Sequence, residues 1–355
     1  MDFSFDESQT AVRELAKTVF ARAGHAAEQP RAIMRELGRA QLLGVGLPAE
    51  VGGADAGLVG LCLLLEQAGA AASLAPLIPA LVLAGLPLAR GHNARAKERL
   101  EALCAGESIL CGALGAQGEP GLRVRREGAD FVLTGTETCV EALPFADAVV
   151  VAARTEAGSR GLFLLDSRAK GVRIEAQAVA SGCSLGSLTL HDVQLGPEAL
   201  LCDLERADEL VEWTLDRAYL AQCAYELGLC QGALALTASY AAERQQFGRP
   251  IGTFQAVAQR IADAHIAVET MRLTLWRAAW LADRDGDARR EIAVARTIAT
   301  RAGHDVVCAA QHIHGGMGFA RDYPLHRYFL ASKQNELRLG GHGFHVARLG
   351  KLLAA

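Results

Sequence analysis

The sequence lacks an excess of basic residues and a CxxC pair. Its 36 Lys and Arg side chains are outnumbered by 40 Asp and Glu, which gives a formal net charge of -4 and argues against a nucleic-acid partner. Nine cysteines are scattered through apolar segments, and an odd number without paired spacing indicates a reducing, cytoplasmic compartment rather than a disulfide framework. Residues 1–9 include three acidic side chains where a secretory signal would be basic and then apolar, so no targeting segment is expected.

Charge is also absent from residues 67–89, a stretch long enough to span a bilayer. Pro76, Pro79 and Pro87 would each interrupt the backbone hydrogen-bond ladder of a spanning helix, and the many Ala and Gly residues make the segment less apolar than a Leu-rich span. We therefore predict a buried pair of helices with a proline-rich joint, and no membrane partner.

Two segments resemble known kinds of site but lack an essential part. The glycine-rich residues 44–53 follow no predicted strand and contain no G-x-G-x-x-G, so we expect a turn rather than a dinucleotide loop. His312 and His314 form an HxH pair without a third ligand at zinc-site spacing. We therefore predict structural histidines and no metal site.

The hydrophobic pattern divides the chain into three parts and predicts an α+β fold. In residues 1–108 apolar side chains recur at helical spacing, which indicates an all-α domain. Residues 109–203 hold short β-favouring runs whose connections are too short for crossover helices, which indicates a largely antiparallel barrel or sandwich. Residues 204–355 are predicted to form a four-helix bundle from four segments: 206–243, 253–284, 288–314 and 324–353.

Several motifs are spread along the whole chain. MDFSFDESQ opens it, and LPAEVGG follows at residues 47–53. Two later segments are more specific, YAAERQQFGRPIGTFQ at residues 240–255 and QHIHGGMGF at residues 311–319. Together they resemble the acyl-CoA dehydrogenase family. The resemblance implies a helix, β and helix architecture, FAD as cofactor, an acyl-CoA or acyl-carrier thioester as substrate, and an oligomer.

The resemblance also implies residues on the ADP side of FAD. In this family the arginine of the first segment reaches the pyrophosphate of a flavin bound mainly by a neighbouring subunit, and a guanidinium suits paired phosphate oxygens. A glycine pair removes the Cβ atoms that would obstruct the ADP moiety. Alone, such residues more often end a helix or fill a core, but the two segments together favour a cofactor site. The implied residues are Arg244, Phe247, Gln255, Gln311, Gly315 and Gly316.

The catalytic base is the main departure from the family. Its members remove the α-proton of an acyl thioester with a carboxylate while the β-hydride passes to the flavin. The two positions that carry this carboxylate hold Leu339 and Ala218 here. Glu226 is the only charged residue between Arg217 and Glu243, on an apolar predicted helix, so we expect a desolvated carboxyl with a raised pKa. It is either the base or a buried structural group, and both alternatives stay open.

The β part departs as well. The loop that normally supplies donors to the flavin is shortened to residues 115–121, and Cys139 and Glu141 stand where the family usually has an aromatic and a hydroxyl residue. These changes resemble the shorter subunits of heteromeric members. We therefore predict an FAD-dependent acyl-CoA dehydrogenase, or a subunit of one that contributes the ADP side of the flavin site in a homo- or hetero-oligomer. The alternatives are a non-catalytic structural partner that binds little FAD alone, and a different flavin reaction such as oxygenation.

Overall fold

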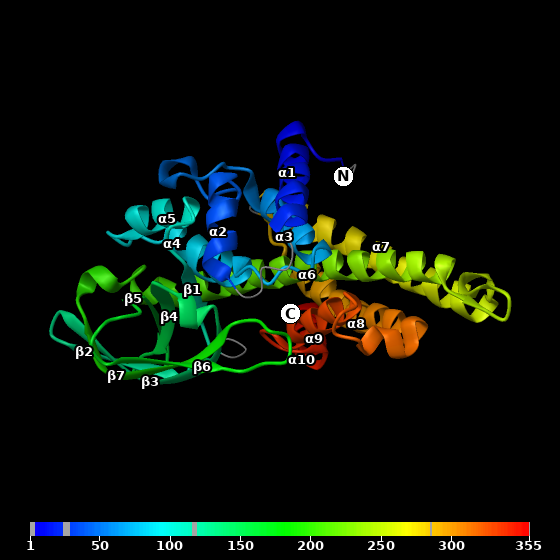
Figure 1. The fold of residues 1–355 in the computed structure, drawn as a ribbon. Coiled ribbons are helices and arrows are strands. Elements are labelled where there is room, and N and C mark those ends of the chain that lie inside the picture. Colours follow the sequence, from blue (N-terminus) through cyan, green and yellow to red (C-terminus); the bar gives the residue numbers. More distant parts are fainter. Residues whose placement is uncertain (1–3, 24–28, 116–118, 285, 355) are drawn as a thin grey trace. The chain divides into compact units, whose positions relative to one another are not determined.

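The computed structural model describes residues 4–23, 29–115, 119–284 and 286–354 (Figure 1). Helices come first, then a sheet, then helices again, so the predicted α+β order is confirmed. The chain forms two compact units, and each unit combines segments that are separated in the sequence. Unit 1 comprises Met1–His25, Cys62–Ser73 and Tyr219–Ala355, and unit 2 comprises Ala26–Leu61 and Leu74–Ala218.

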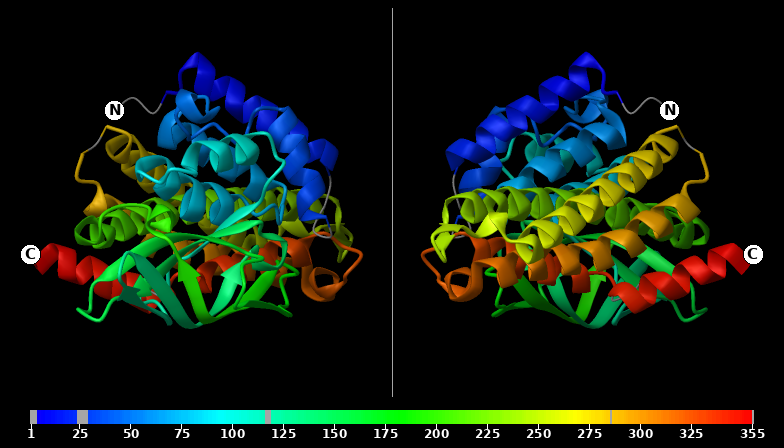
Figure 2. Two further views of the ribbon diagram at one scale, coloured as in Figure 1. Left: turned by 90° about the vertical axis from the view of Figure 1, so that its left-hand side faces the viewer. Right: turned by 90° about the vertical axis from the view of Figure 1, so that its right-hand side faces the viewer.

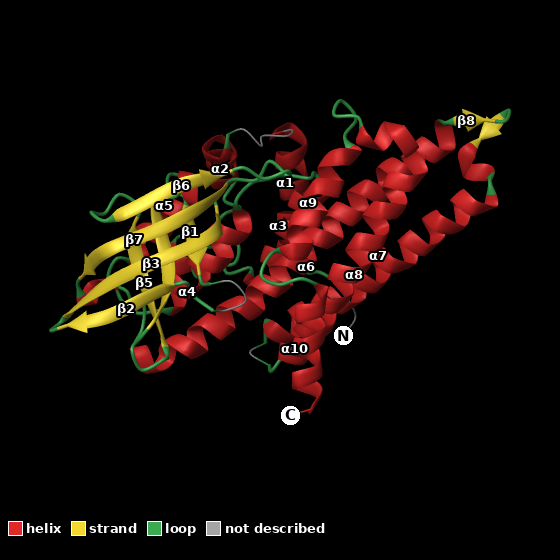
Figure 3. Ribbon diagram, turned by 90° about the horizontal axis from the view of Figure 1, so that it is seen from below, coloured by secondary structure: helices red, strands yellow, loops and turns green. Residues whose placement is uncertain are grey.

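Unit 2 contains a seven-stranded sheet, visible as the yellow strands of Figure 3. The strand order is β1-β4-β2-β3-β7-β6, and β5 pairs with β4. Pairing is largely antiparallel, as predicted, but β4 runs parallel to both β1 and β2 and makes the sheet mixed. The strands are β1 (Leu110–Ala113), β2 (Leu122–Glu127), β3 (Asp130–Glu141), β4 (Ala148–Arg154), β5 (Arg160–Asp166), β6 (Val172–Gln177) and β7 (Leu185–Leu195).

The uncharged segment 67–89 is helical on both sides of a joint. Helix α3 (Gly57–Ala70) ends first, and a π-helical segment, η2 (Ile78–Gly85), then runs into α4 (Leu86–Arg90). Pro79 and Pro87 lie in first turns, where a missing N–H costs no helical bond. Among the described residues, no helix is long and apolar enough to cross a membrane. The other helices of this region are α1 (Glu7–Ala23), α2 (Pro30–Arg39) and α5 (Ala96–Cys104).

Long helices dominate the C-terminal region. Three begin and end within four residues of their predicted limits: α6 (Leu204–Glu243), α7 (Gln255–Ala282) and α8 (Arg289–His314). Helices α7 and α8 pack side by side in unit 1, coloured yellow and orange in Figure 2. The fourth predicted helix was wrong. It is split into α9 (Leu325–Leu337) and α10 (His342–Ala354). Leu339 and Gly340 between them have φ of 54° and 106°, and a left-handed backbone cannot continue an α-helix.

The backbones of α3 and α6 touch in unit 1. A Cβ added to Gly69 would lie 2.1 Å from the Tyr225 carbonyl oxygen, and one added to Gly228 would lie 1.9 Å from that of Glu66. Two glycines therefore permit this approach. The Gln231 amide then donates to the Glu66 carboxylate at 2.7 Å. This close contact fixes the register of the two helices.

Candidate functional site

The turn between α6 and α7 presents an aromatic side chain to solvent. Gln246 pairs with Arg249 in a short hairpin, β8 (Gln245–Gln246) with β9 (Arg249–Pro250), seen beyond the ends of the two helices in Figure 3. Its two loop residues, Phe247 and Gly248, have φ of 54° and 78°. This two-residue turn favours Asn-Gly, so a phenylalanine in its first position is strained. Phe247 is nevertheless 92% exposed, which is typical of a residue kept for binding.

Arg244 lies at the base of this hairpin. Its backbone N–H donates to the Tyr240 carbonyl at 2.8 Å, and its own carbonyl accepts from the Ile251 N–H at 2.8 Å. The side chain is exposed, and no ion pair holds it within the described residues. Gln255, also exposed, begins α7. The exposed Arg244 and the exposed Phe247 are thus both presented by this turn.

The glycine turn, defined here as Gly315–Phe319, follows α8 directly. Gly315 has φ 57° and ψ -135°, a conformation that only glycine adopts readily. A Cβ added to Gly315 or Gly316 would meet nothing within 4 Å. The backbone of this turn is therefore open on the side where a ligand could approach.

Gln311 lies beneath the glycine turn with an unmet donor. Its side chain is 9% exposed, and its amide nitrogen has no hydrogen-bond partner among the described residues. A Cβ on Gly318 would come within 2.6 Å of that nitrogen, so the turn packs directly on the amide. A buried N–H without a partner costs about 1–3 kcal/mol, and a ligand oxygen would remove that cost. Because Gly318 covers this nitrogen, the amide supports a ligand site only together with the open backbone of Gly315 and Gly316.

The two segments lie at the same end of unit 1. The ring of Tyr240, one turn before Arg244, stacks on that of His314, which precedes Gly315, with 4.3 Å between ring centroids. The structure therefore brings the segments of the predicted ADP-side residues together. Their binding role stays a prediction.

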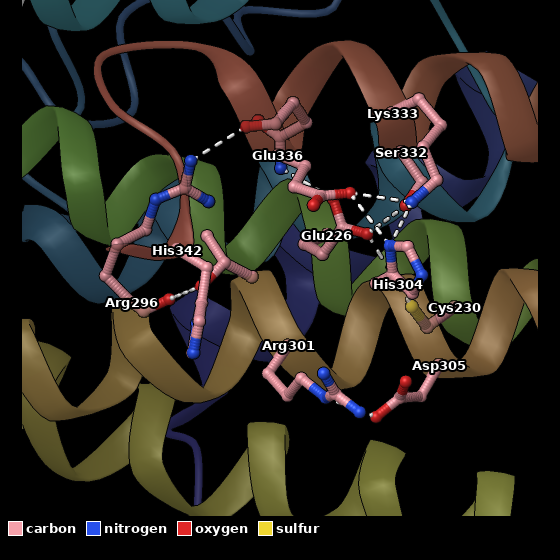
Figure 4. A network of polar contacts seen from close by, with 12 residues as sticks. Glu226, Cys230, Arg296, Arg301, His304, Asp305, Ser332, Lys333, Glu336 and His342 are labelled. Carbon is pink, nitrogen blue, oxygen red and sulfur yellow. Dashed lines mark hydrogen bonds and ion pairs between the residues drawn. The ribbon is translucent and has the colours of Figure 1, made fainter. Parts of the chain in front are cut away.

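Glu226 lies in a different setting, inside the helices of unit 1 (Figure 4). It is 2% exposed. One carboxylate oxygen accepts from the Ser332 hydroxyl at 2.5 Å, and the other accepts from the Asn335 amide at 2.7 Å. Burial raises the pKa of Glu226, and these two hydrogen bonds oppose that shift. A Cβ on Gly303 would come 2.3 Å from the carboxylate, so the backbone of α8 packs against it.

These contacts favour the structural alternative for Glu226. Both carboxylate oxygens accept from α9, and a helix backbone covers the group. The Cys230 thiol provides a further, longer contact of 3.8 Å. The role of Glu226 as a base stays a prediction.

Comparison with known proteins identifies the chain. Models of the N-terminal and C-terminal domains of acyl-CoA dehydrogenase match residues 6–107 and 209–351. Acyl-CoA dehydrogenase FadE27 of Mycobacterium tuberculosis is 36% identical, over 91% of this chain and 88% of that protein. The chain belongs to the acyl-CoA dehydrogenase family.

Two solved structures of named pairs share the fold of this chain. A chain of the ChsE4-ChsE5 complex from Mycobacterium tuberculosis is 34% identical with a TM-score of 0.93, covering 100% of this chain and 99% of that one. A chain of the Tcur3481-Tcur3483 steroid ACAD G363A variant is 39% identical with a TM-score of 0.90, covering 98% of both chains. The family is FAD-dependent.

In this chain, hydrogen bonds fix the backbone of the turn at one of the two family base positions. Leu339 lies in the turn between α9 and α10, and the Arg338 carbonyl before it accepts from Gln222 at 3.1 Å and from Arg296 at 3.3 Å. His345 donates to the Gly340 carbonyl at 3.0 Å. The sequence did not predict the role of these three buried side chains. Only Arg296, a lone arginine on an apolar stretch of α8, offered a signal for one of them. The other base position, Ala218, is fully buried.

The predicted flavin-facing loop of the β part is described only in part, because residues 116–118 lie outside the described residues. At its end the Gly121 N–H donates to the Glu137 carboxylate at 2.7 Å. Cys139 is exposed, with φ 58° at a register shift of β3. No group of three or more metal-ligating side chains is found among the described residues.

Proposed function

We propose that this chain is a subunit of an FAD-dependent acyl-CoA dehydrogenase and contributes the ADP side of the flavin site in an oligomer. The observation that carries the proposal is the meeting of the Arg244 hairpin with the open glycine turn, which the stack of Tyr240 on His314 brings together. Arg244, exposed at the same end of unit 1, adds the charge that a pyrophosphate needs. These residues fit the ADP moiety in donors, charge and free space.

In the proposed complex each of these residues binds rather than reacts. Arg244 pairs with the pyrophosphate, the glycine turn admits the ADP moiety, and Phe247 and Gln255 flank the adenosine. When bound, FAD supplies the hydride acceptor for α,β-desaturation of an acyl-CoA or acyl-carrier thioester. Remote binding contacts of this kind set affinity and orientation rather than the chemical step.

A partner subunit supplies the catalytic base in this proposal. Leu339 and Ala218 cannot accept a proton, and the contacts of Glu226 are those of a structural group. The ChsE4-ChsE5 and Tcur3481-Tcur3483 structures are each named for two different chains, which supports a hetero-oligomer. The second candidate is a purely structural partner subunit, and the same missing carboxylates favour it. We place the complex in the cytoplasm, in keeping with the unpaired spacing of the cysteines.

The test is Arg244→Ala in the complex purified with its partner. A charge-assisted contact is worth about 1.5–3 kcal/mol, so FAD affinity should fall roughly ten- to a hundredfold with the melting temperature unchanged. Arg277→Ala is the matched control, because this side chain is also exposed and lies far along α7. Unchanged FAD affinity in Arg244→Ala would refute the assigned site. A complex that contains no FAD at all would support the purely structural partner.

A further inference from the structure

Three aromatic side chains meet where the two ADP-side segments adjoin. Tyr240 stacks on His314 with an angle of 22° between the ring planes. Tyr323, which follows the glycine turn, has its ring 5.2 Å from that of His314 and 6.3 Å from that of Tyr240. These three residues, the ring triad, therefore link the last turn of α6, the last residue of α8 and the exit of the glycine turn.

The hydrogen bonds of His314 define its tautomer. Its Nδ1 lies 2.9 Å from the Ala310 carbonyl oxygen, which can only accept, so Nδ1 carries the proton. Nε2 is then a bare acceptor and receives the Tyr323 hydroxyl at 3.0 Å. Burial lowers the pKa of His314 and raises that of Tyr323, so both side chains are neutral at neutral pH. The imidazole thus connects α8 to the residue that ends the turn.

The Tyr323–His314 bond closes a loop of eight residues, 315–322, at its base. That loop contains Gly315 and Gly316, which have no side chain to hold the backbone in one conformation. Tyr240 supports the imidazole from α6, and its carbonyl accepts the Arg244 N–H at 2.8 Å. The ring triad therefore holds the glycine turn and the Arg244 turn in one fixed relation.

We propose that Tyr240, His314 and Tyr323 are positioning residues of the ADP-side site. They hold the backbone of the glycine turn in one conformation before a ligand arrives and set it at a defined distance from Arg244. A flexible glycine loop would lose conformational entropy on binding, and the hydrogen bond removes part of that loss beforehand. The proposal rests on the proposed binding of ADP by this end of the chain.

The test compares two tyrosines by titrating the flavin-free complex of this chain and its partner with ADP in a calorimeter. Tyr323 and Tyr328 both pack on the apolar cluster of Ala233, Ala310 and Leu325. Tyr323→Phe removes the hydroxyl bonded to His314, whereas Tyr328→Phe removes one bonded to the Ala70 carbonyl at 2.8 Å, outside the triad. We expect Tyr323→Phe to weaken ADP binding roughly three- to tenfold and Tyr328→Phe to leave it unchanged. Equal ADP affinity in the two variants would overturn the positioning role.

A double-mutant cycle separates positioning from simple loss of stability. His314→Asn keeps a donor for the Ala310 carbonyl but offers Tyr323 no ring acceptor. If the two side chains act through one bond, ADP binds the double variant as tightly as either single variant. Additive losses of ADP affinity would contradict the proposal. Nitrogen NMR of the histidine ring gives a second check, because a proton on Nε2 rather than Nδ1 would overturn the assigned bond.

Arg244→Ala distinguishes failure here from failure of the proposed function. If it weakens ADP binding while Tyr323→Phe does not, the ADP site stands and the ring triad is only structural. If the wild-type chain binds ADP no better than Arg244→Ala, the ADP site itself is refuted, and the positioning role with it.

Discussion

The Gln311 amide and the Glu226 carboxylate lie in the same unit and differ in how far their polar atoms are satisfied. Glu226 is 2% exposed, and Ser332 and Asn335 donate to its two carboxylate oxygens. Gln311 is 9% exposed, yet its amide nitrogen has no partner among the described residues. In the sequence both are isolated polar residues on helices. Asn335 Oδ1, in the Glu226 network, also has no partner among the described residues, so an unmet hydrogen bond points to a ligand only where an open surface adjoins it, as at the glycine turn.

Backbone strain occurs in both regions, so a positive φ alone does not distinguish a binding residue from a structural one. Phe247 and Leu339 both have φ of 54°. Phe247 is 92% exposed in a hairpin, whereas the carbonyls on either side of Leu339 accept hydrogen bonds from buried side chains. The strained Phe247 is exposed to solvent, whereas the strained turn at Leu339 is held by hydrogen bonds from buried side chains. Strain therefore indicates binding only where the side chain is also available.

Removing the Glu226 side chain should have the largest effect. Glu226→Ala removes the acceptor of the buried Ser332 hydroxyl and one of the two acceptors of the Asn335 amide, so the free energy of unfolding should fall by about 3–5 kcal/mol. Chemical denaturation measures this loss. The exposed Glu243 at the end of α6 is the control, because Glu243→Ala should change stability by about 0.5 kcal/mol or less. Equal stability of the two variants would break the contrast between the regions.

Glu226→Gln tests the catalytic alternative with little change in shape. We expect the partnered complex to desaturate acyl-CoA in proportion to its folded fraction. A base at this position would instead give no desaturation and no anaerobic flavin bleaching, with melting temperature and flavin content nearly unchanged. Leu339→Glu is the complementary variant, since relatives carry their carboxylate in that turn. Loss of desaturation in Glu226→Gln, with melting temperature and flavin content nearly unchanged, would place the catalytic base in this chain.

A methyl group on the glycine turn should separate binding from stability. Gly316→Ala meets open space, so the melting temperature should stay the same, while FAD affinity of the complex should fall about tenfold, or about 1.4 kcal/mol. Flavin titration measures the loss. Gly343 on α10 also faces open space, and Gly343→Ala should leave FAD affinity unchanged. Full FAD affinity in Gly316→Ala would show that no ligand approaches this turn.

The smallest expected change is a gain in stability. Phe247→Asn creates the Asn-Gly pair that a two-residue hairpin with positive φ favours, so the free energy of unfolding should rise by about 0.5–1 kcal/mol. FAD affinity should fall, because the exposed ring is lost. Denaturation and flavin titration of the same preparation measure both. A loss of stability would show that Phe247 is packed in the free chain rather than kept for a ligand.

The sequence predicts the long helices well because their signal is local. Apolar spacing and the end of each pattern gave α7 and α8 to within a few residues. The short strands β1 and β2 carry little local signal, because LCGA is only four residues long and LRVRRE is mostly charged. The break between α9 and α10 was missed, although Gly340 and Gly341 were a visible signal for it.

The site was predictable only as far as neighbours in the sequence define it. The isolation of Glu226 on an apolar helix correctly indicated burial and a raised pKa. Its partners could not be predicted, because Ser332 and Asn335 lie 106 and 109 residues away. The stacking of Tyr240 on His314 is another long-range contact that periodicity cannot reveal. Local motifs therefore gave the candidate residues, and only the tertiary structure separates their roles.

The contact of α3 with α6 through Gly69 and Gly228 affects the order in which the chain can fold. Unit 1 combines Cys62–Ser73 with residues from Tyr219 onward, so about 145 residues of unit 2 emerge from the ribosome between them. The apolar face of α3 therefore cannot pack against α6 while unit 2 is being synthesised. Closing so long a loop is slow. We expect the early N-terminal segment to depend on chaperones until α6 has been synthesised.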